Sequence, residues 1–236
     1  MRRFPRGPSD ETLLARLERI ADAYGVVLVL ILVTFVVTLT LPPNGWAGRS
    51  AAVTIAGATS IIALTSSDVR LDRVRFAALW AVLATVLSIL AKIFDSRWLL
   101  GFAFIIISVL LTIAAGTVLR RVITAVDVSF RTILGAISVY TLLGLLFGNL
   151  FLALGQLKGG HVFTGLSHPE ARDYMFFSYT TLTTTGYGNL VPSGDIGQVL
   201  AVLEMLAGQI FLVTLVAGLV SLWRPGARPL PDEPPR

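Results

Sequence analysis

The stretch Thr183-Thr184-Thr185-Gly186-Tyr187-Gly188-Asn189 decides how the rest of the chain is interpreted. It follows a short apolar run, Tyr174–Leu182, which has too few residues to cross a bilayer. Just upstream, Ser167-His168-Pro169-Glu170 has the Ser-x-x-Glu spacing of a capping box, with proline in the first turn. These signals predict a helix of about four turns, from His168 to about Thr183, that enters a membrane and stops midway. Such re-entrant backbone is tolerated only where protein buries it or where it lines a water-filled cavity, so the pattern indicates a pore.

Composition places the whole chain in the membrane. Of its 236 residues, 55% are hydrophobic and 14% are charged, whereas ordinary soluble domains carry about 25% charged residues. The mean hydropathy is +0.79. The chain has no cysteine, which excludes a disulfide scaffold, thiol catalysis and any cysteine-based zinc or iron–sulfur site.

Six apolar stretches surround or precede the re-entrant segment, and each ends at a turn or a charged residue. Because every backbone polar group in hydrocarbon must be satisfied within its own segment, these stretches are predicted to be helices. We therefore expect an all-α membrane protein with six transmembrane helices and a re-entrant helix and loop between helices five and six. The predicted spans are Tyr24–Leu41, Ala51–Thr65, Phe76–Ala91, Trp98–Leu119, Ile133–Leu154 and Ile196–Trp223.

The distribution of basic residues predicts the orientation. Most of the 19 lysines and arginines lie on the side that holds both termini. The positive-inside rule then places both termini in the cytoplasm of a multi-pass plasma-membrane protein. The net charge of +5 is interpreted as arginines that meet anionic lipid, and no nucleic-acid partner is expected.

Four regions follow from this layout. Residues 1–23 are expected to form a cytoplasmic amphipathic segment, with a solvated cap on the first span as the alternative. Residues 24–123 are expected to form a peripheral four-helix domain, and residues 132–223 a pore domain of helix, pore helix, loop and helix. Residues 224–236 form a short, proline-rich cytoplasmic tail.

The residues Thr184-Thr185-Gly186-Tyr187-Gly188, which follow a half-helix between two spans, resemble the selectivity filter of potassium channels. The six-span layout resembles the bacterial members of the tetrameric cation channel superfamily, and the specific resemblance covers roughly Phe176 to Leu222. We call Thr184–Gly188 the filter segment. The sequence departs from the family pattern in having Asn189 in place of a common Asp, Thr185 in place of the commoner Val, and phenylalanines at 176 and 177 where tryptophans are frequent. The hydrogen bond between Asp and Trp that commonly ties the filter to its helix therefore cannot form here.

The physical requirements of ion binding fit the same residues. A potassium ion that loses its water needs a ring of oxygens, and successive carbonyls point the same way only if left- and right-handed conformations alternate. Gly186 and Gly188 stand two apart, as that alternation requires. The expected potassium ligands are the carbonyl oxygens of Thr184, Thr185, Gly186 and Tyr187, with the Thr184 hydroxyl at the inner end.

Three further expectations follow from this filter segment. The Tyr187 side chain is predicted to point away from the axis and to brace the segment against the half-helix. Unpaired carbonyls at the C-terminal end of that helix are expected to favour a cation. Because one chain offers one strand of oxygens, a closed ring needs a homotetramer.

The sixth span contains two residues of interest. Glu204 is its deeply placed ionisable residue, expected to lie behind the filter and to accept hydrogen bonds from the hydroxyls of Thr180 or Thr181. The alternative is a rim residue that reaches outer water. With Asn189, these residues form the predicted filter support. Gly208 matches the hinge glycine of the family's inner helix, with close helix packing as a compatible alternative.

The leading functional prediction is passive potassium conduction. Span four, Trp98–Leu119, has no charged residue, so no conventional voltage sensor is expected. A less selective monovalent cation channel, a non-conducting accessory subunit and a secondary transporter are the alternatives. No span carries a nucleophile–base or metal-ligand cluster, so we expect neither enzymatic activity nor a cofactor besides permeant K+. The expected partners are membrane lipids and further copies of the chain, and a regulatory lipid or protein is left open.

Overall fold

The computed structural model describes residues 25–37, 40, 46–65, 71–124 and 130–222. The regular secondary structure of these residues is helical, and isolated bridges that join Phe163 to Leu166 and to Pro192 are the β pairings found in them. The predicted N-terminal segment 1–23 and the tail 224–236 lie outside the described residues. The helices are Gly25–Val37, α2 (Trp46–Thr65), α3 (Leu71–Ile93), α4 (Arg97–Ile123), α5 (Phe130–Leu157), α6 (Ala171–Leu182) and α7 (Asp195–Leu222).

Four of these helices, α3, α4, α5 and α7, are long and apolar enough to cross a membrane. The described apolar parts of the first helix and of α2 are shorter, at Gly25–Val37 and Val53–Thr65. The chain is therefore an all-helical membrane protein, as its composition predicts. α3 and α4 run past the predicted ends at Ala91 and Leu119. The basic residues Lys92, Arg120 and Arg121 therefore lie within the last turns of these helices. A long basic side chain can reach water from such a position while the helix continues.

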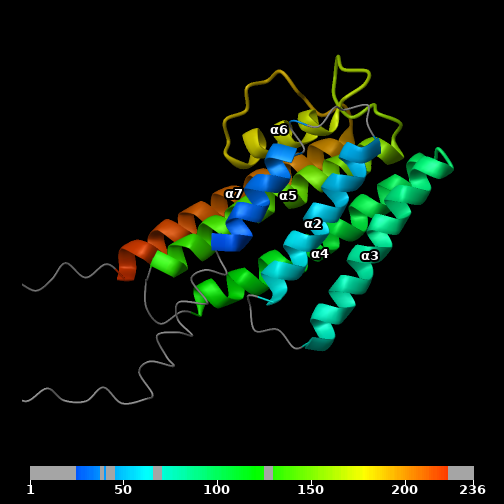
Figure 1. Ribbon diagram of the computed structural model, residues 1–236. Coiled ribbons are helices and arrows are strands. Elements are labelled where there is room, and N and C mark those ends of the chain that lie inside the picture. Colours follow the sequence, from blue (N-terminus) through cyan, green and yellow to red (C-terminus); the bar gives the residue numbers. More distant parts are fainter. Residues whose placement is uncertain (1–24, 38–39, 41–45, 66–70, 125–129, 223–236) are drawn as a thin grey trace, which may run out of the picture.

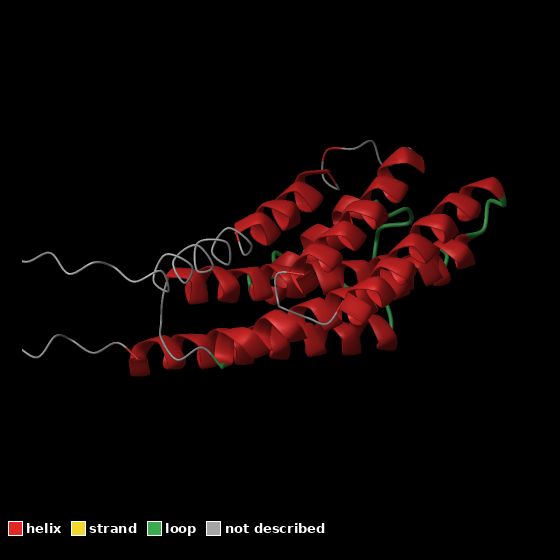
Figure 2. Ribbon diagram, turned by 60° about the horizontal axis from the view of Figure 1, so that its bottom comes forward, coloured by secondary structure: helices red, strands yellow, loops and turns green. Residues whose placement is uncertain are grey.

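The helices pack in an order that follows the sequence (Figures 1 and 2). α2, α3 and α4 contact one another, α4 packs extensively against α5, and α5 contacts both α6 and α7. Small residues allow close approach in the first group: a Cβ on Gly57 of α2 would lie 3.1 Å from Ala81 Cβ of α3. Within α3 the buried residues are all small, namely Ala77, Ala81, Ala84, Ser88 and Ala91, a pattern typical of tightly packed membrane helices.

The short helix α6 lies between α5 and α7 in the sequence and contacts both. It begins at Ala171 rather than His168, so the predicted start is wrong and Pro169 precedes the helix. The capping box is formed by Glu170 and Asp173, and the Glu170 backbone nitrogen donates to Asp173 Oδ2 over 2.7 Å. An acidic pair in the first turn suits the positive end of the helix dipole. With 12 residues, α6 is about one turn shorter than expected.

Candidate functional site

A row of glycines on α5 receives the side chains of α6. A Cβ on Gly144 would lie 2.6 Å from the Tyr179 ring, and Cβ atoms on Gly148 and Gly155 would overlap Met175 and Tyr174. The absence of side chains at these three positions therefore lets α6 lie directly against the α5 backbone. The Gly-x-x-x-Gly pair of α5 serves close packing, as its spacing predicts.

Hydroxyl groups then fix α6 in this position. Tyr179 donates to Thr141 O of α5 over 2.8 Å, and Tyr140 of α5 donates to Leu182 O, the last residue of α6, over 3.1 Å. The Tyr179 ring also meets Phe35 of the first helix edge to face, with 5.1 Å between the ring centroids. α6 is thus held by α5 and also contacts Phe35 of the first helix.

The backbone of the filter segment alternates in conformation. Thr184, Gly186 and Gly188 have φ values of +57°, +50° and +78°, whereas the intervening Thr185 and Tyr187 do not have positive φ. The spacing of the two glycines predicts this alternation, whereas its start at Thr184 was not predicted. Extending the two-residue period back from Gly188 would have found it. A left-handed non-glycine residue costs about 1–2 kcal/mol, and such strain is concentrated at functional sites.

Main-chain hydrogen bonds attach the filter segment to the end of α6. Thr184 N donates to Thr181 O over 3.0 Å, while Thr185 N and Gly186 N both donate to Thr180 O, over 2.8 and 3.1 Å. The expectation of unpaired carbonyls at this helix end is therefore wrong, because the chain turns back over the helix and pairs them. The end of α6 therefore presents fewer unpaired carbonyls to a cation than predicted.

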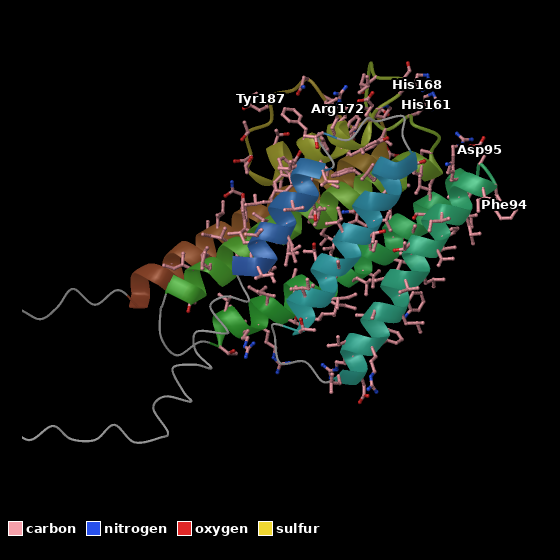
Figure 3. The ribbon with its side chains drawn as sticks, viewed as in Figure 1. Phe94, Asp95, His161, His168, Arg172 and Tyr187 are labelled. Carbon is pink, nitrogen blue, oxygen red and sulfur yellow. The ribbon has the colours of Figure 1, made fainter. Side chains whose placement is uncertain are left out.

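The Tyr187 ring lies against α6, as predicted for it. It stacks on Phe176 with 5.8 Å between ring centroids and an interplanar angle of 11°. A ring-to-ring contact thus joins the filter segment to α6 at the position where the sequence analysis expected no hydrogen bond between Asp and Trp. Figure 3 shows Tyr187 at the same end of the helix bundle as His161, His168 and Arg172. Tyr187 is nevertheless 70% exposed in the single chain.

Glu204 of α7 is fully buried, with 0% of its surface exposed. Its Oε1 lies 2.5 Å from the hydroxyl of Ser178, which is also 2.8 Å from Gly144 O. Among the described residues, Oε2 has no hydrogen-bond partner. The single chain thus buries Glu204, as predicted, rather than leaving it at the rim. The predicted hydroxyl partners Thr180 and Thr181 are wrong, since Ser178 occupies that place and the Thr180 hydroxyl donates to Phe177 O.

One turn along α7, Gly208 packs on the end of α6. A Cβ there would lie 2.5 Å from Leu182 O, which accounts for the glycine by close packing, while its hinge role stays a prediction. The next residue, Gln209, was not recognised from the sequence: its Nε2 lies 3.5 Å from Thr184 Oγ1. The side chains of Thr183 and Thr185 share a hydrogen bond of 2.9 Å, and Asn189 is exposed.

Comparisons with known proteins concern this same region. Residues 139–224 match a protein family described as "Ion channel". A segment of 64 residues is 38% identical to the inward rectifier potassium channel Kirbac3.1 of Paramagnetospirillum magnetotacticum, covering 27% of this chain and 22% of that channel. The chain thus spans about a fifth of the length of this relative. Both matches support an ion channel.

Proposed function

We propose that this chain is a member of the potassium channel family, which its two matches support, and that it forms a homotetrameric pore that conducts K+ passively and selectively. The observation that carries the proposal is the alternating backbone of Thr184–Gly188 at the end of a buried half-helix. Conduction requires no covalent chemistry, so the protein acts as a channel and not as an enzyme, and K+ is its permeant ligand rather than a cofactor.

The filter segment supplies the ligands in this proposal. The carbonyl oxygens of Thr184, Thr185, Gly186 and Tyr187 replace the water of a dehydrated potassium ion, and the Thr184 hydroxyl adds an oxygen at the inner end. Gly188 completes the alternation. Support comes from the carbonyls of Thr180 and Thr181, which hold the segment, and from the ring and hydroxyl contacts of Tyr179, which hold α6 itself.

A tetramer explains which surfaces are exposed in the single chain. The filter segment is exposed throughout, although a strand of oxygens on a pore axis must face other strands. α7 also exposes an apolar stripe with alternating spacings of four and three residues, the spacing of a helix–helix seam. The stripe consists of Val199, Leu203, Leu206, Ile210 and Val213, which are 59%, 53%, 53%, 62% and 64% exposed. We propose that neighbouring copies cover part of this surface around the pore.

The remaining parts of the proposal concern gating and support. Glu204 and Ser178 are proposed to hold α6 against α7 behind the filter, with Asn189 at its outer end, and Gly208 is proposed to let α7 bend. No charged residue lies between Arg97 and Arg120 of α4, so conduction is proposed to depend only weakly on voltage. The proposed setting is the plasma membrane, with six spans and both termini in the cytoplasm.

Potassium efflux from proteoliposomes tests the function. Purified protein is reconstituted into vesicles with K+ inside and Na+ outside. Because K+ that leaves makes the interior negative, protons enter through an added uncoupler, and a pH dye follows their uptake. We expect rapid flux with K+ or Rb+, little flux with Na+ or Li+, and block by barium. Gly186→Ala is the matched variant. The φ of +50° at Gly186 strains an alanine, whereas nothing in the single chain lies within 4 Å of the added Cβ.

Each alternative has its own outcome in this assay. Comparable flux with Na+ and K+ identifies a less selective cation channel, for which the Thr185 hydroxyl beside the filter is the structural reason. A purified tetramer without flux identifies an accessory subunit. Transport that requires a second ion identifies a transporter. Native mass spectrometry of the same preparation tests the tetramer independently.

A further inference from the structure

A cavity on the peripheral side of the bundle has no place in the conduction proposal. It has a volume of about 350 Å³ and is lined by residues of α2, α3 and α4, within the range of small-ligand pockets, about 300–1,000 Å³. Its floor is formed by Leu64, Ala77 and Leu110, which are 1%, 3% and 2% exposed. The cavity therefore reaches past the surface of the helices into their apolar interior.

The rim of the cavity is open and apolar. Phe76 of α3 and Ile113 of α4 are 59% and 45% exposed, and both belong to helices apolar enough to cross a membrane. In a membrane this opening faces hydrocarbon rather than water. An occupant therefore presents an apolar chain to the floor and rim.

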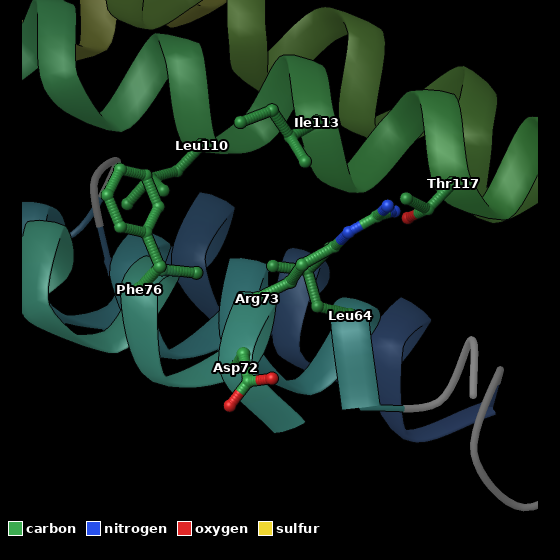
Figure 4. A pocket seen from close by; sticks show the side chains of 8 residues that line it. Leu64, Asp72, Arg73, Phe76, Leu110, Ile113 and Thr117 are labelled. Carbon is green, nitrogen blue, oxygen red and sulfur yellow. The ribbon is translucent and has the colours of Figure 1, made fainter. Parts of the chain in front are cut away.

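One cation stands at the same opening. Arg73, in the first turn of α3, lines the cavity, and Figure 4 shows its side chain extended toward Thr117 of α4. Within the part of the chain that the structure describes, Arg73 takes part in no ion pair. Asp72 also lines the cavity, but its side chain points away from Arg73 and Thr117 (Figure 4). The Arg73 guanidinium thus has donors available for an anion.

The surroundings add positive charge. Arg75 follows on α3, and the last turn of α4 carries Arg120 and Arg121, so basic residues outnumber Asp72 at this end of the two helices. The Thr117 hydroxyl donates to Ala114 O over 2.8 Å, so its proton is not available to an anion. The sequence predicts that this end of the bundle faces the cytoplasm, where anionic lipids attract basic residues.

From this combination we propose that the cavity binds one anionic phospholipid, whose phosphate contacts Arg73 and whose acyl chain occupies the apolar floor. A guanidinium suits a phosphate through paired N–H donors, and the buried floor suits a hydrocarbon chain. A soluble phosphate would leave that floor empty, and a wholly apolar molecule would leave Arg73 without an anion. The proposal does not depend on ion conduction.

Fluorescence quenching by brominated lipid tests the site. Trp80 is suitable because its ring lies 5.8 Å from that of Phe76 at the rim. A variant with Trp46→Phe, Trp98→Phe and Trp223→Phe retains Trp80 as the single tryptophan of the four in the sequence. It is reconstituted in phosphatidylcholine vesicles with increasing amounts of phosphatidylglycerol brominated on the acyl chain, or with brominated phosphatidylcholine.

We expect saturable quenching with a preference for phosphatidylglycerol of about fivefold, the factor that one basic residue near an anionic surface contributes. Arg73→Gln should abolish this preference. Arg75→Gln is the matched control, because it removes the same charge two residues along the helix, on a different face, and should keep the preference. Ile113→Phe, which narrows the cavity without changing charge, should weaken quenching by both lipids.

Three results would overturn the proposal. Equal quenching by the two lipids shows ordinary annular contact, equal loss in Arg73→Gln and Arg75→Gln shows a diffuse basic surface, and competition by glycerol 3-phosphate without acyl chains shows a free-phosphate site. Native mass spectrometry gives the same comparison by counting retained phosphatidylglycerol. It uses the protein that keeps all four tryptophans, with and without Arg73→Gln. This second measurement applies if the triple tryptophan variant does not fold.

Discussion

Ser178 of α6 and Glu204 of α7 lie within 2.5 Å of each other, hydroxyl oxygen to Oε1, at a site from which water is excluded. The same hydroxyl is 2.8 Å from Gly144 O of α5. One serine of α6 thus contacts both α5 and α7. Because the filter segment is tied to the last carbonyls of α6, movement of Ser178 is transmitted to Thr184–Gly186 through a single turn of helix.

Glu204→Leu separates positioning from general stability. The substitution removes the carboxyl, whose Oε2 has no partner among the described residues, and leaves Ser178 with Gly144 O as acceptor. We expect the free energy of unfolding to change by less than about 1 kcal/mol. The permeability ratio of K+ to Na+ should fall about fivefold, which is the value of one hydrogen bond. Reversal potentials in mixed salts measure the ratio, and Met205→Leu is the control. An unchanged ratio in Glu204→Leu would show that the carboxyl does not position the filter.

Gly144→Ala tests the packing of α6 on α5. The new Cβ would lie 2.6 Å from the Tyr179 ring, and displacing that ring strains its hydrogen bond to Thr141 O. We expect a loss of about 1–3 kcal/mol in stability, measured by thermal unfolding in detergent. Gly116→Ala is the control, since nothing lies within 4 Å of its Cβ, and it should stabilise helix α4 by up to about 1 kcal/mol. Equal changes in thermal stability at the two positions would contradict the close contact between Gly144 and the Tyr179 ring.

Removal of potassium is expected to destabilise the assembly. If the filter oxygens bind K+ only in the folded tetramer, K+ at about a hundred times its Kd adds about 2.7 kcal/mol to the stability of the tetramer. Replacing K+ by Li+ should therefore lower the temperature at which tetramers dissociate on gel electrophoresis. Gly186→Ala should remove this dependence on the ion. A dissociation temperature that is the same in K+ and Li+ would argue against potassium at Thr184–Gly188.

Gln209→Leu tests the residue that the sequence analysis did not identify. Its amide lies 3.5 Å from the Thr184 hydroxyl, and its side chain is exposed in the single chain. We expect little change in thermal stability and a several-fold weaker block by barium applied from the inner side, because the orientation of the Thr184 hydroxyl is no longer assisted. Ile210→Leu serves as the matched control, and unaltered block in Gln209→Leu would exclude this role.

The fold was predictable where one signal dominates. Long apolar stretches define α3, α4, α5 and α7, since hydrocarbon leaves the backbone no alternative to a helix. A short helix between α5 and α7 was also predicted, because its apolar run has too few residues to cross a membrane. The spacing of Gly186 and Gly188 predicts the alternation of the filter backbone, which is a local property of glycine.

Features that depend on distant contacts were not predictable. Both Ser167-x-x-Glu170 and Glu170-x-x-Asp173 have capping-box spacing, and the preceding loop decides between them. That loop pairs with a segment beyond the filter, through Thr164 N to Val191 O and Ser193 N to Val162 O, so the start of α6 depends on residues far along the chain. Similarly, positions 178, 180 and 181 all carry hydroxyls. The rotation of α6 against α5 and α7 determines that the Ser178 hydroxyl is the one that contacts Glu204.

The attachment of Thr184, Thr185 and Gly186 to α6 uses amide and carbonyl groups that every residue type except proline possesses. A point mutation in this stretch that respects the backbone angles can change the side chain without breaking these main-chain hydrogen bonds to α6. Side chains such as those of Thr185 and Asn189 can consequently differ from the commoner residues at these positions while the main-chain attachment stays intact.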